Sequence, residues 1–172
     1  MEEDELLGEI CTAAETFGAK CTKFGGAVTV EVLRRFLIRH RIPVSCRDVY
    51  IRGLPIEIDL LIPAKDAVPA YGILYEPQQV RCVLEVKKLG SFGEPTVKTV
   101  RVSFERIARL GGAIRCAYVT LEERKGYRFA ITQETIGFPC FTLFWHWGSS
   151  KSLQRETSGD WKRLVEFLQE FI

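Results

Sequence analysis

The chain has 172 residues, 47% of them apolar and 27% charged, and a formal net charge of +2. These values are typical of a soluble globular protein, and the length suits a single domain, residues 1–172, with a substantial core. The acidic opening sequence MEEDELLGEI is unlike a secretory or organelle signal, and no apolar run approaches membrane-spanning length, so we expect a cytoplasmic protein without a membrane partner.

Two helices are predicted in the first quarter of the chain. Apolar residues at helical spacing indicate a helix over about 4–18, and Gly25-Gly26 is expected to break the chain after it. A second helix is predicted over about 28–40, and Pro43 ends it. The apolar stripe of this second helix consists of Val32, Leu33, Phe36 and Leu37.

Two strands and a long connection follow. Segments 44–52 and 56–62 have strand character and are separated by a turn around Gly53. Residues 63–79 contain three prolines and Gly72, so we expect a long hairpin connection there. Alternation along 56–62 places Asp59 with Glu57 and Leu61 on one face of the strand. The opposite face is apolar and consists of Ile56, Ile58, Leu60 and Ile62.

Residues 82–88, CVLEVKK, combine an apolar strand with two charges that need an explanation. Glu85 and Lys87 are two residues apart and therefore project from the same face of the strand. A carboxylate and an ammonium are costly to bury unless each has a partner. The two side chains are therefore either paired with other groups or part of a site.

The second half of the chain predicts a helix over about 96–110, stopped by Gly111-Gly112, and a buried strand over 113–121. Peripheral strands are expected over 127–131 and 140–147. Asp160 can cap a C-terminal helix that packs through one apolar stripe. The buried positions expected in these two helices are Val97, Val100, Phe104 and Ile107, then Trp161, Leu164, Val165, Leu168 and Phe171.

The cysteines and histidines do not predict a zinc site. The six cysteines contain no C-x-x-C pair, and the only histidines are at positions 40 and 146. Cys82 and Cys116 lie in apolar runs, where a free thiol behaves as a small core residue. We therefore expect reduced, mostly structural cysteines.

Asp59 and Glu85 are predicted to meet. Folding two antiparallel strands about Gly72 puts these residues opposite each other, because 72 is midway between 59 and 85. Two carboxylates, completed by a backbone carbonyl and water, are ligands that Mg²⁺ accepts, because this ion keeps much of its hydration shell. The sequence therefore predicts a shared cation site without histidine.

With these residues in place, the chain resembles the PD-(D/E)XK nuclease superfamily, which includes restriction endonucleases and Holliday-junction resolvases. Asp59 matches the first acidic position, and Glu85-Val86-Lys87 matches the (D/E)-x-K element, over a region of about 28–121. The resemblance implies an α/β fold with an αβββαβ core, a central mixed sheet flanked by helices, and here extra N-terminal and C-terminal helices.

The resemblance also implies an activity, the metal-dependent hydrolysis of phosphodiester bonds in nucleic acid, with DNA favoured. Asp59 and Glu85 would ligate one or two Mg²⁺ or Mn²⁺ ions, and Lys87 would hold the attacking water. Many members carry a further glutamate on a helix before the first strand, and here Glu31, Glu9 and Glu57 all stay open as candidates. A homodimer is implied by the resemblance alone.

Two alternatives stay open. The first keeps the fold without the chemistry, as a DNA-binding or complex-assembly subunit, and the second treats Glu85 and Lys87 as a structural charge pair on an unrelated α/β domain.

The basic residues indicate where a polyanion would bind. Residues 31–52 carry six arginines against two acids, and residues 79–109 carry seven basic residues against three acids. Such segments attract nucleic acid, although charged runs also commonly solvate helix faces. The candidate nucleic-acid contacts are Lys88, Lys98 and Arg101.

Overall fold

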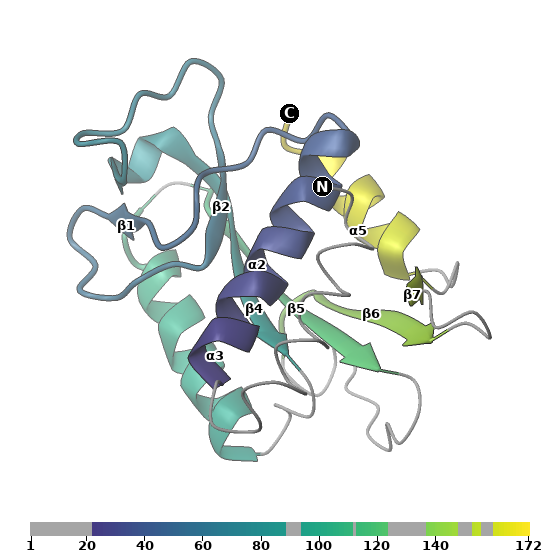
Figure 1. Cartoon of the computed structure of the whole chain (residues 1–172). Helices are drawn as coiled ribbons and strands as arrows, with labels where there is room; N and C mark the ends of the chain where they lie inside the picture. The colour runs from purple at the N-terminus through teal and green to yellow at the C-terminus, as the bar shows by residue number, and fades with distance from the viewer. Residues whose placement is uncertain (1–21, 89–93, 112, 124–136, 148–152, 156–159) are drawn as a thin grey trace.

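A computed structural model gives the fold of the chain (Figure 1). It describes residues 22–88, 94–111, 113–123, 137–147, 153–155 and 160–172. The predicted helix 4–18 and the predicted strand 127–131 lie outside these residues.

The described part of the chain contains three α-helices, one 3₁₀ helix and seven strands. The helices are α2 (Thr22–Arg39), α3 (Glu94–Ala108) and α5 (Asp160–Gln169), with a short 3₁₀ helix, η2 (Pro77–Gln79). The strands are β1 (Tyr50–Ile51), β2 (Leu60–Pro63), β3 (Leu74–Tyr75), β4 (Val80–Lys88), β5 (Arg115–Glu123), β6 (Cys140–Trp147) and β7 (Leu153–Arg155).

The main sheet is mixed and has the strand order β2-β4-β5-β6-β7. Strands β4, β5 and β6 run parallel to one another, whereas β2 and β7 pair antiparallel at the two ends. Helix α3 makes the crossover from β4 to the parallel strand β5, as such connections require. The short strands β1 and β3 form a separate parallel pair beside this sheet.

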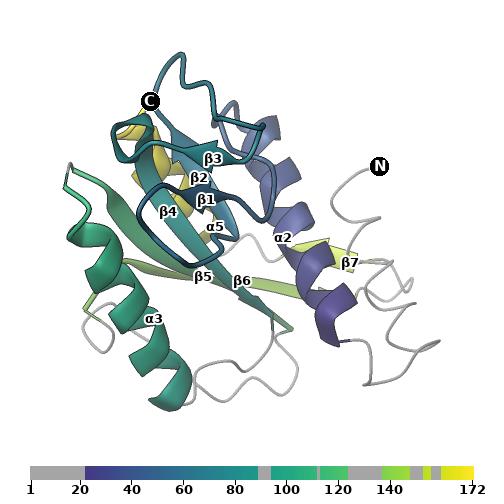
Figure 2. The same ribbon diagram turned by 90° about the vertical axis from the view of Figure 1, so that its left-hand side faces the viewer.

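Helices cover both faces of the main sheet, so the molecule has three layers. Figures 1 and 2 show α2 and α5 on one face and α3 on the other, with the β1-β3 pair on the side of α3. Two apolar clusters follow this division, one between the sheet and α2 with α5, and one between the sheet and α3. The predicted α/β fold with a central mixed sheet flanked by helices is confirmed.

The alternation of β4 assigns its side chains to these two layers. Cys82, Leu84 and Val86 are buried in the cluster beneath α2, and Val83 is buried in the cluster beneath α3. Glu85 and Lys87 have the same parity as Val83 and therefore project on the α3 side. The face of β4 toward α2 is therefore entirely apolar, and Glu85 and Lys87 project together from the opposite face, as predicted.

Segment 44–49 runs antiparallel beside the start of β2. The backbone N–H of Ser45 donates to the Leu61 carbonyl at 2.9 Å, and Val49 and Ile58 exchange two backbone hydrogen bonds. The predicted strands 44–52 and 56–62 therefore do pair, but only Tyr50–Ile51 and Leu60–Pro63 are regular strand.

The apolar face predicted for segment 56–62 is partly wrong. The sequence predicts that Ile56 and Ile58 share a face with Leu60 and Ile62. Instead, Ile56 and Ile58 pack against the α3 cluster, as Leu61 does, while Leu60 and Ile62 pack in the α2 cluster. The strict alternation of side chains fails because the backbone bends at Asp59, immediately before β2.

The predicted break at Gly25-Gly26 is also wrong, because α2 begins at Thr22 and runs through both glycines. Glycine costs a helix about 1 kcal/mol relative to alanine, and the tertiary packing of the later turns outweighs that cost. The expected apolar stripe is confirmed, since Val32, Leu33, Phe36 and Leu37 are all buried.

The C-terminal helix is positioned by its first residue. The Asp160 carboxylate accepts a hydrogen bond from the Thr142 N–H of β6 at 2.8 Å, and the Trp161 indole N–H donates to the Phe144 carbonyl at 3.0 Å. Trp161 also packs edge-on against Phe36 of α2. These contacts tie α5 to both β6 and α2. Among the described residues, no helix is long and apolar enough to cross a membrane.

Candidate active site

Asp59 and Glu85 meet across the β2–β4 pair. Leu60 is paired with Leu84 and Leu61 with Val83, so continuing the register by one residue places Asp59 opposite Glu85. The Val86 backbone N–H donates a hydrogen bond to Asp59 Oδ2 at 2.7 Å. This bond fixes the Asp59 carboxylate against β4, where the sequence predicted it.

Lys87 contacts both carboxylates. Its ammonium forms an ion pair with Glu85 Oε1, and its Nζ lies 3.9 Å from Asp59 Oδ2. The side chains of Asp59, Glu85 and Lys87 retain 23%, 22% and 34% of their exposure. The three groups are therefore partly desolvated yet reachable from the solvent.

The surroundings shift the proton equilibria of two of these groups. Burial and the neighbouring Glu85 charge raise the pKa of Asp59 to about 6, against the smaller opposing effects of Lys87 and of the Val86 N–H. Burial by itself lowers the pKa of Lys87, but the charge and hydrogen bond of Glu85, with the charge of Asp59, outweigh it and raise that pKa. Lys87 is therefore an ammonium at neutral pH.

The donor atoms fit a hard divalent cation. Two carboxylates beside one ammonium leave one net negative charge, and burial followed by the Glu85 charge raises the pKa of Asp59. Within the described ranges, no group of three or more acidic, histidine or cysteine side chains converges. Two carboxylates suit Mg²⁺, which retains several water ligands.

A pocket of about 290 Å³ opens beside these groups. Glu85 and Lys87 of β4 form one wall, and one face of α3 forms the other. The residues of α3 that line it are Thr96, Thr99, Val100 and Ser103. Glu85 and Lys87 therefore lie at the wall of a cavity rather than on a flat sheet surface.

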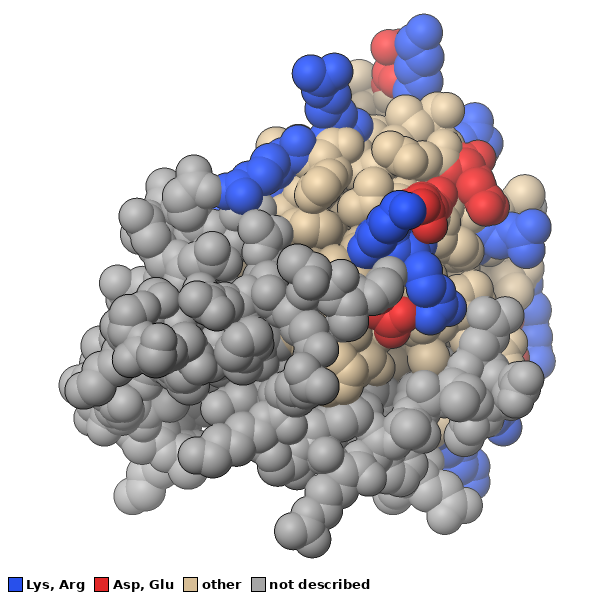
Figure 3. Space-filling view, turned by 90° about the vertical axis from the view of Figure 1, so that its right-hand side faces the viewer, with Lys and Arg blue, Asp and Glu red and all other residues tan. Residues whose placement is uncertain are grey.

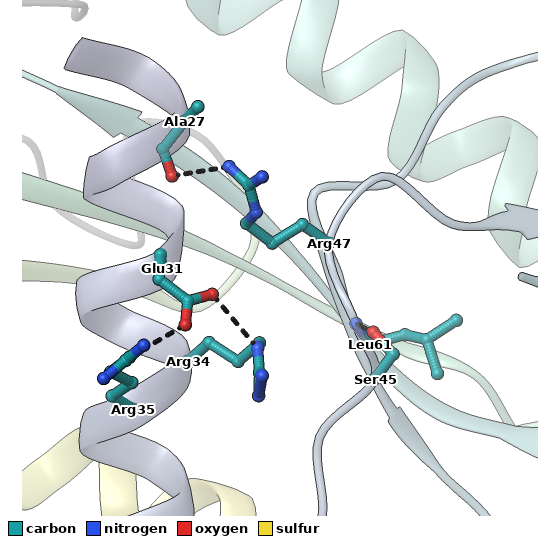
Figure 4. Close-up of polar contacts among 7 residues, drawn as sticks. All are labelled: Ala27, Glu31, Arg34, Arg35, Ser45, Arg47 and Leu61. Atoms are coloured by element: carbon teal, nitrogen blue, oxygen red, sulfur yellow. Dashed lines mark hydrogen bonds and ion pairs between the residues drawn. The ribbon is translucent and has the colours of Figure 1, made fainter. Parts of the chain in front are cut away.

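Of the three glutamates left open by the sequence, Glu31 and Glu57 lie within the described residues, and both pair with groups other than Asp59 and Glu85. Figure 4 shows Glu31 turned toward Arg34 and Arg35, with which it pairs at 3.2 and 2.9 Å. Glu57 is exposed and accepts a hydrogen bond from the Tyr50 hydroxyl at 3.0 Å. Glu9 lies outside the described residues.

Sequence reasoning missed Asp48. Its negative charge contributes to the raised pKa of Asp59, although less than burial and Glu85 do. The pairing of Val49 with Ile58 puts Asp48 opposite Asp59, and the Asp48 N–H reaches the Asp59 carbonyl at 3.4 Å. The register of the predicted strands 44–52 and 56–62 was the signal that could have located it.

Two of the predicted nucleic-acid contacts, Lys98 and Arg101, project away from the pocket. Lys98 and Arg101 are exposed on α3, and at about 100° per residue they lie roughly 140° to 160° around the helix from Ser103. Lys88 is the last residue of β4. Contact of these three residues with nucleic acid stays a prediction.

The arginines of 31–52 are largely engaged within the protein. Besides the pairs with Glu31, Arg52 pairs with Glu76 at 2.6 Å and Arg47 donates to the Ala27 carbonyl at 2.9 Å (Figure 4). Figure 3 shows basic and acidic side chains lying side by side near the centre of the described surface, with further basic side chains toward its edge. The charge of this segment is therefore partly neutralised.

The described cysteines are free thiols, and three of them are buried. Burial raises the pKa of Cys116 to about 12 and that of Cys140 to about 11, and it raises the pKa of Cys82 further. A thiol with so high a pKa is a poor nucleophile and a poor metal ligand at neutral pH. Cys82 and Cys116 act as core residues, as predicted.

The described layers and strand order define an α/β protein with a restriction-endonuclease-like fold, and solved structures share it. NucC of P. aeruginosa ATCC27853 in its cAAA-bound form is similar with a TM-score of 0.63 and 12% identity, over 98% of this chain and 88% of that one. NucC of E. coli MS115-1, also cAAA-bound, is similar with a TM-score of 0.56 and 16% identity, over 98% and 86%. No protein-family model and no curated protein matches the chain.

Proposed function

We propose that this protein is a metal-dependent nuclease that hydrolyses phosphodiester bonds in nucleic acid, with DNA as the first substrate to test. The observation that supports it best is the convergence of Asp59, immediately before β2, with Glu85 and Lys87 of β4, the last two of which lie at the wall of a pocket. The fold shared with NucC is compatible with the proposal.

Asp59 and Glu85 are the residues that would hold Mg²⁺ or Mn²⁺. A bound divalent cation supplies Lewis-acid chemistry, lowering the pKa of a water molecule and offsetting the charge that develops on phosphate oxygens. The Val86 N–H keeps one Asp59 oxygen oriented at 2.7 Å, so this carboxylate is preorganised by the backbone of the strand that carries Glu85.

The role proposed for Lys87 is electrostatic. Its pKa is raised by the two carboxylates, so it carries hydrogens to donate rather than a lone pair to accept a proton. An ammonium at this position can donate to the attacking water, leaving a lone pair of the water oxygen directed at phosphorus. It also stabilises the negative charge that grows on the phosphate oxygens during the attack.

The charges of the site match the proposed substrate. Without a cation, the three side chains together carry one negative charge and repel a phosphodiester. A divalent cation reverses that sign to one positive charge, which attracts the singly charged phosphodiester. Substrate binding is thereby expected to be tighter with the cation than in EDTA, where only the basic residues and neutral contacts favour binding.

Cleavage assays test the proposal directly. Purified protein is incubated with labelled linear duplex, single-stranded and branched DNA in Mg²⁺ or Mn²⁺, beside an EDTA control and the variants Asp59→Asn, Glu85→Gln and Lys87→Ala. Lys162→Ala is the matched control, because it removes a lysine–glutamate pair at 3.4 Å on the exposed face of α5.

Cleavage that disappears with EDTA and in the three site variants, but persists in Lys162→Ala, supports the proposal. Salt-dependent binding without cleavage of any DNA would overturn it in favour of a DNA-binding or assembly subunit. Neither binding nor cleavage would leave Glu85 and Lys87 as a structural charge pair.

A further inference from the structure

The α3 wall of the pocket carries hydroxyl groups that the proposed chemistry does not use. Thr96, Thr99 and Ser103 face Glu85 and Lys87 across the cavity. Their spacing of three and four residues puts all three on one stripe of the helix. The pocket therefore has a charged wall on β4 and a neutral polar wall on α3.

This stripe is separate from the other two faces of α3. Val100, Phe104 and Ile107 are buried against the sheet, and Lys98 and Arg101 are exposed. Threonine and serine are weaker helix formers than alanine, so helix propensity does not favour hydroxyls at Thr96 and Ser103. The position of this stripe across from the carboxylates suggests a role in binding.

The chemistry of this wall suits the sugar-phosphate backbone. Hydroxyls donate to phosphate oxygens and accept from sugar hydroxyls, and such contacts position a nucleic acid without reading its sequence. A volume of about 290 Å³ lies at the lower end of the range for small-molecule pockets, which suits one nucleotide unit better than a larger ligand.

We propose that the pocket between β4 and α3 binds the sugar-phosphate unit next to the scissile phosphodiester, with Thr96 and Ser103 as hydrogen-bonding contacts. The proposal rests on the proposed nuclease function for the identity of the reacting bond. Lys98 and Arg101 would contact more distant phosphates, since they project from other sides of α3.

The two kinds of contact differ in their response to salt. Lysine and arginine contacts to phosphate release counterions, so removing them flattens the dependence of log affinity on log salt concentration. Neutral hydroxyl contacts release no counterions, so removing them lowers the affinity equally at every salt concentration.

The test compares four proteins by fluorescence anisotropy with labelled single-stranded and duplex oligonucleotides in EDTA over a series of KCl concentrations. They are the wild type, Thr96→Val/Ser103→Ala, the hydroxyl-preserving Thr96→Ser/Ser103→Thr, and Lys98→Gln/Arg101→Gln. Circular dichroism checks that each variant is folded. If Thr96→Val/Ser103→Ala is unfolded, the single variant Ser103→Ala takes its place. Hydrolysis in Mg²⁺ is measured in parallel.

The hydroxyl-deficient variant is expected to bind roughly tenfold more weakly, with an unchanged salt slope, because it loses two neutral hydrogen bonds. The hydroxyl-preserving variant should bind like the wild type, and Lys98→Gln/Arg101→Gln should flatten the slope. Wild-type affinity in Thr96→Val/Ser103→Ala would overturn the pocket proposal. Because binding is measured without metal, the pocket is tested even if the wild type does not hydrolyse DNA. A lack of hydrolysis would count against the nuclease function and not against the pocket.

Discussion

Lys87 has two opposing effects on the site. Its ammonium stabilises Glu85 and Asp59 in the absence of a metal, because it contacts the first and lies 3.9 Å from the second. The same contacts put a positive charge where a divalent cation would bind. Lys87 should therefore be needed for catalysis and at the same time compete with the metal.

Replacing Lys87 with methionine separates the two effects. Lys87→Met keeps most of the stem and removes the charge, so we expect cleavage to fall by about 10²- to 10³-fold, as when another electrostatic stabiliser is removed. Mn²⁺ affinity, measured by calorimetry, should rise severalfold because no ammonium must be displaced. Unchanged or weaker Mn²⁺ binding in Lys87→Met, with Lys162→Met behaving as the wild type, would contradict this account.

Asp59 lowers the stability of the metal-free protein at neutral pH. Its pKa rises from 3.8 to about 6 on folding, so the folded state favours the protonated acid. The stabilisation that protonated Asp59 provides is fully present below pH 3.8 and is lost as the pH rises through 6.

The isosteric variant Asp59→Asn should remove this penalty, because the amide oxygen can still accept the Val86 N–H. We expect Asp59→Asn in EDTA to be more stable than the wild type at pH 8 by roughly 1–3 kcal/mol, and the advantage to shrink below pH 5. Urea denaturation at both pH values measures this difference. An equal difference at the two pH values would assign the effect to packing rather than charge.

The pairing of segment 44–49 with β2 depends on a buried hydroxyl. Ser45 Oγ accepts the Leu61 N–H at 3.0 Å and is only 4% exposed (Figure 4). Ser45→Ala leaves that N–H unsatisfied, which costs about 1–3 kcal/mol. Thermal denaturation should show a lower Tm, and amide exchange should be faster at Leu61. Ser103→Ala, at a partly exposed serine, is the control and should change stability by less than about 0.5 kcal/mol.

The sequence predicted the elements whose apolar pattern is strong. The stripes of α2 and α5 and the alternation of β4 each leave few alternatives for the buried face. The charges Glu85 and Lys87 interrupt an otherwise apolar strand, so they were visible as an anomaly, and Asp59 followed from the antiparallel register about Gly72.

The features that the sequence did not predict depend on contacts between distant segments. The bend at Asp59 shifts Ile58 to the α3 cluster, and local alternation contains no sign of it. The pocket depends on how α3 packs across β4, which no periodicity in either element specifies. The position of Asp48 opposite Asp59 could be predicted only from the exact pairing of two irregular segments.

The site lies on a part of the sheet where little movement is expected. The larger apolar cluster, between the sheet and the helices α2 and α5, fixes β4 and β5 from one side. Glu85 and Lys87 lie on the other side of β4, next to α3, and Asp59 lies opposite Glu85. A cation that binds them joins β2 to β4, and its binding energy should therefore add to the stability of the entire fold.

A metal that binds only the folded chain raises its free energy of unfolding, by about 2.7 kcal/mol at a hundred times the dissociation constant. For a chain of this size that corresponds to an increase in Tm of about 5–10 °C. We therefore expect saturating Mg²⁺ or Mn²⁺ to raise the Tm of the wild type relative to EDTA, and to leave that of Glu85→Gln nearly unchanged, as measured by scanning calorimetry. Lys162→Ala should show the full increase. Equal increases in the wild type and Glu85→Gln would place the stabilising ion away from β2 and β4, and Asp59 and Glu85 would then not be its ligands.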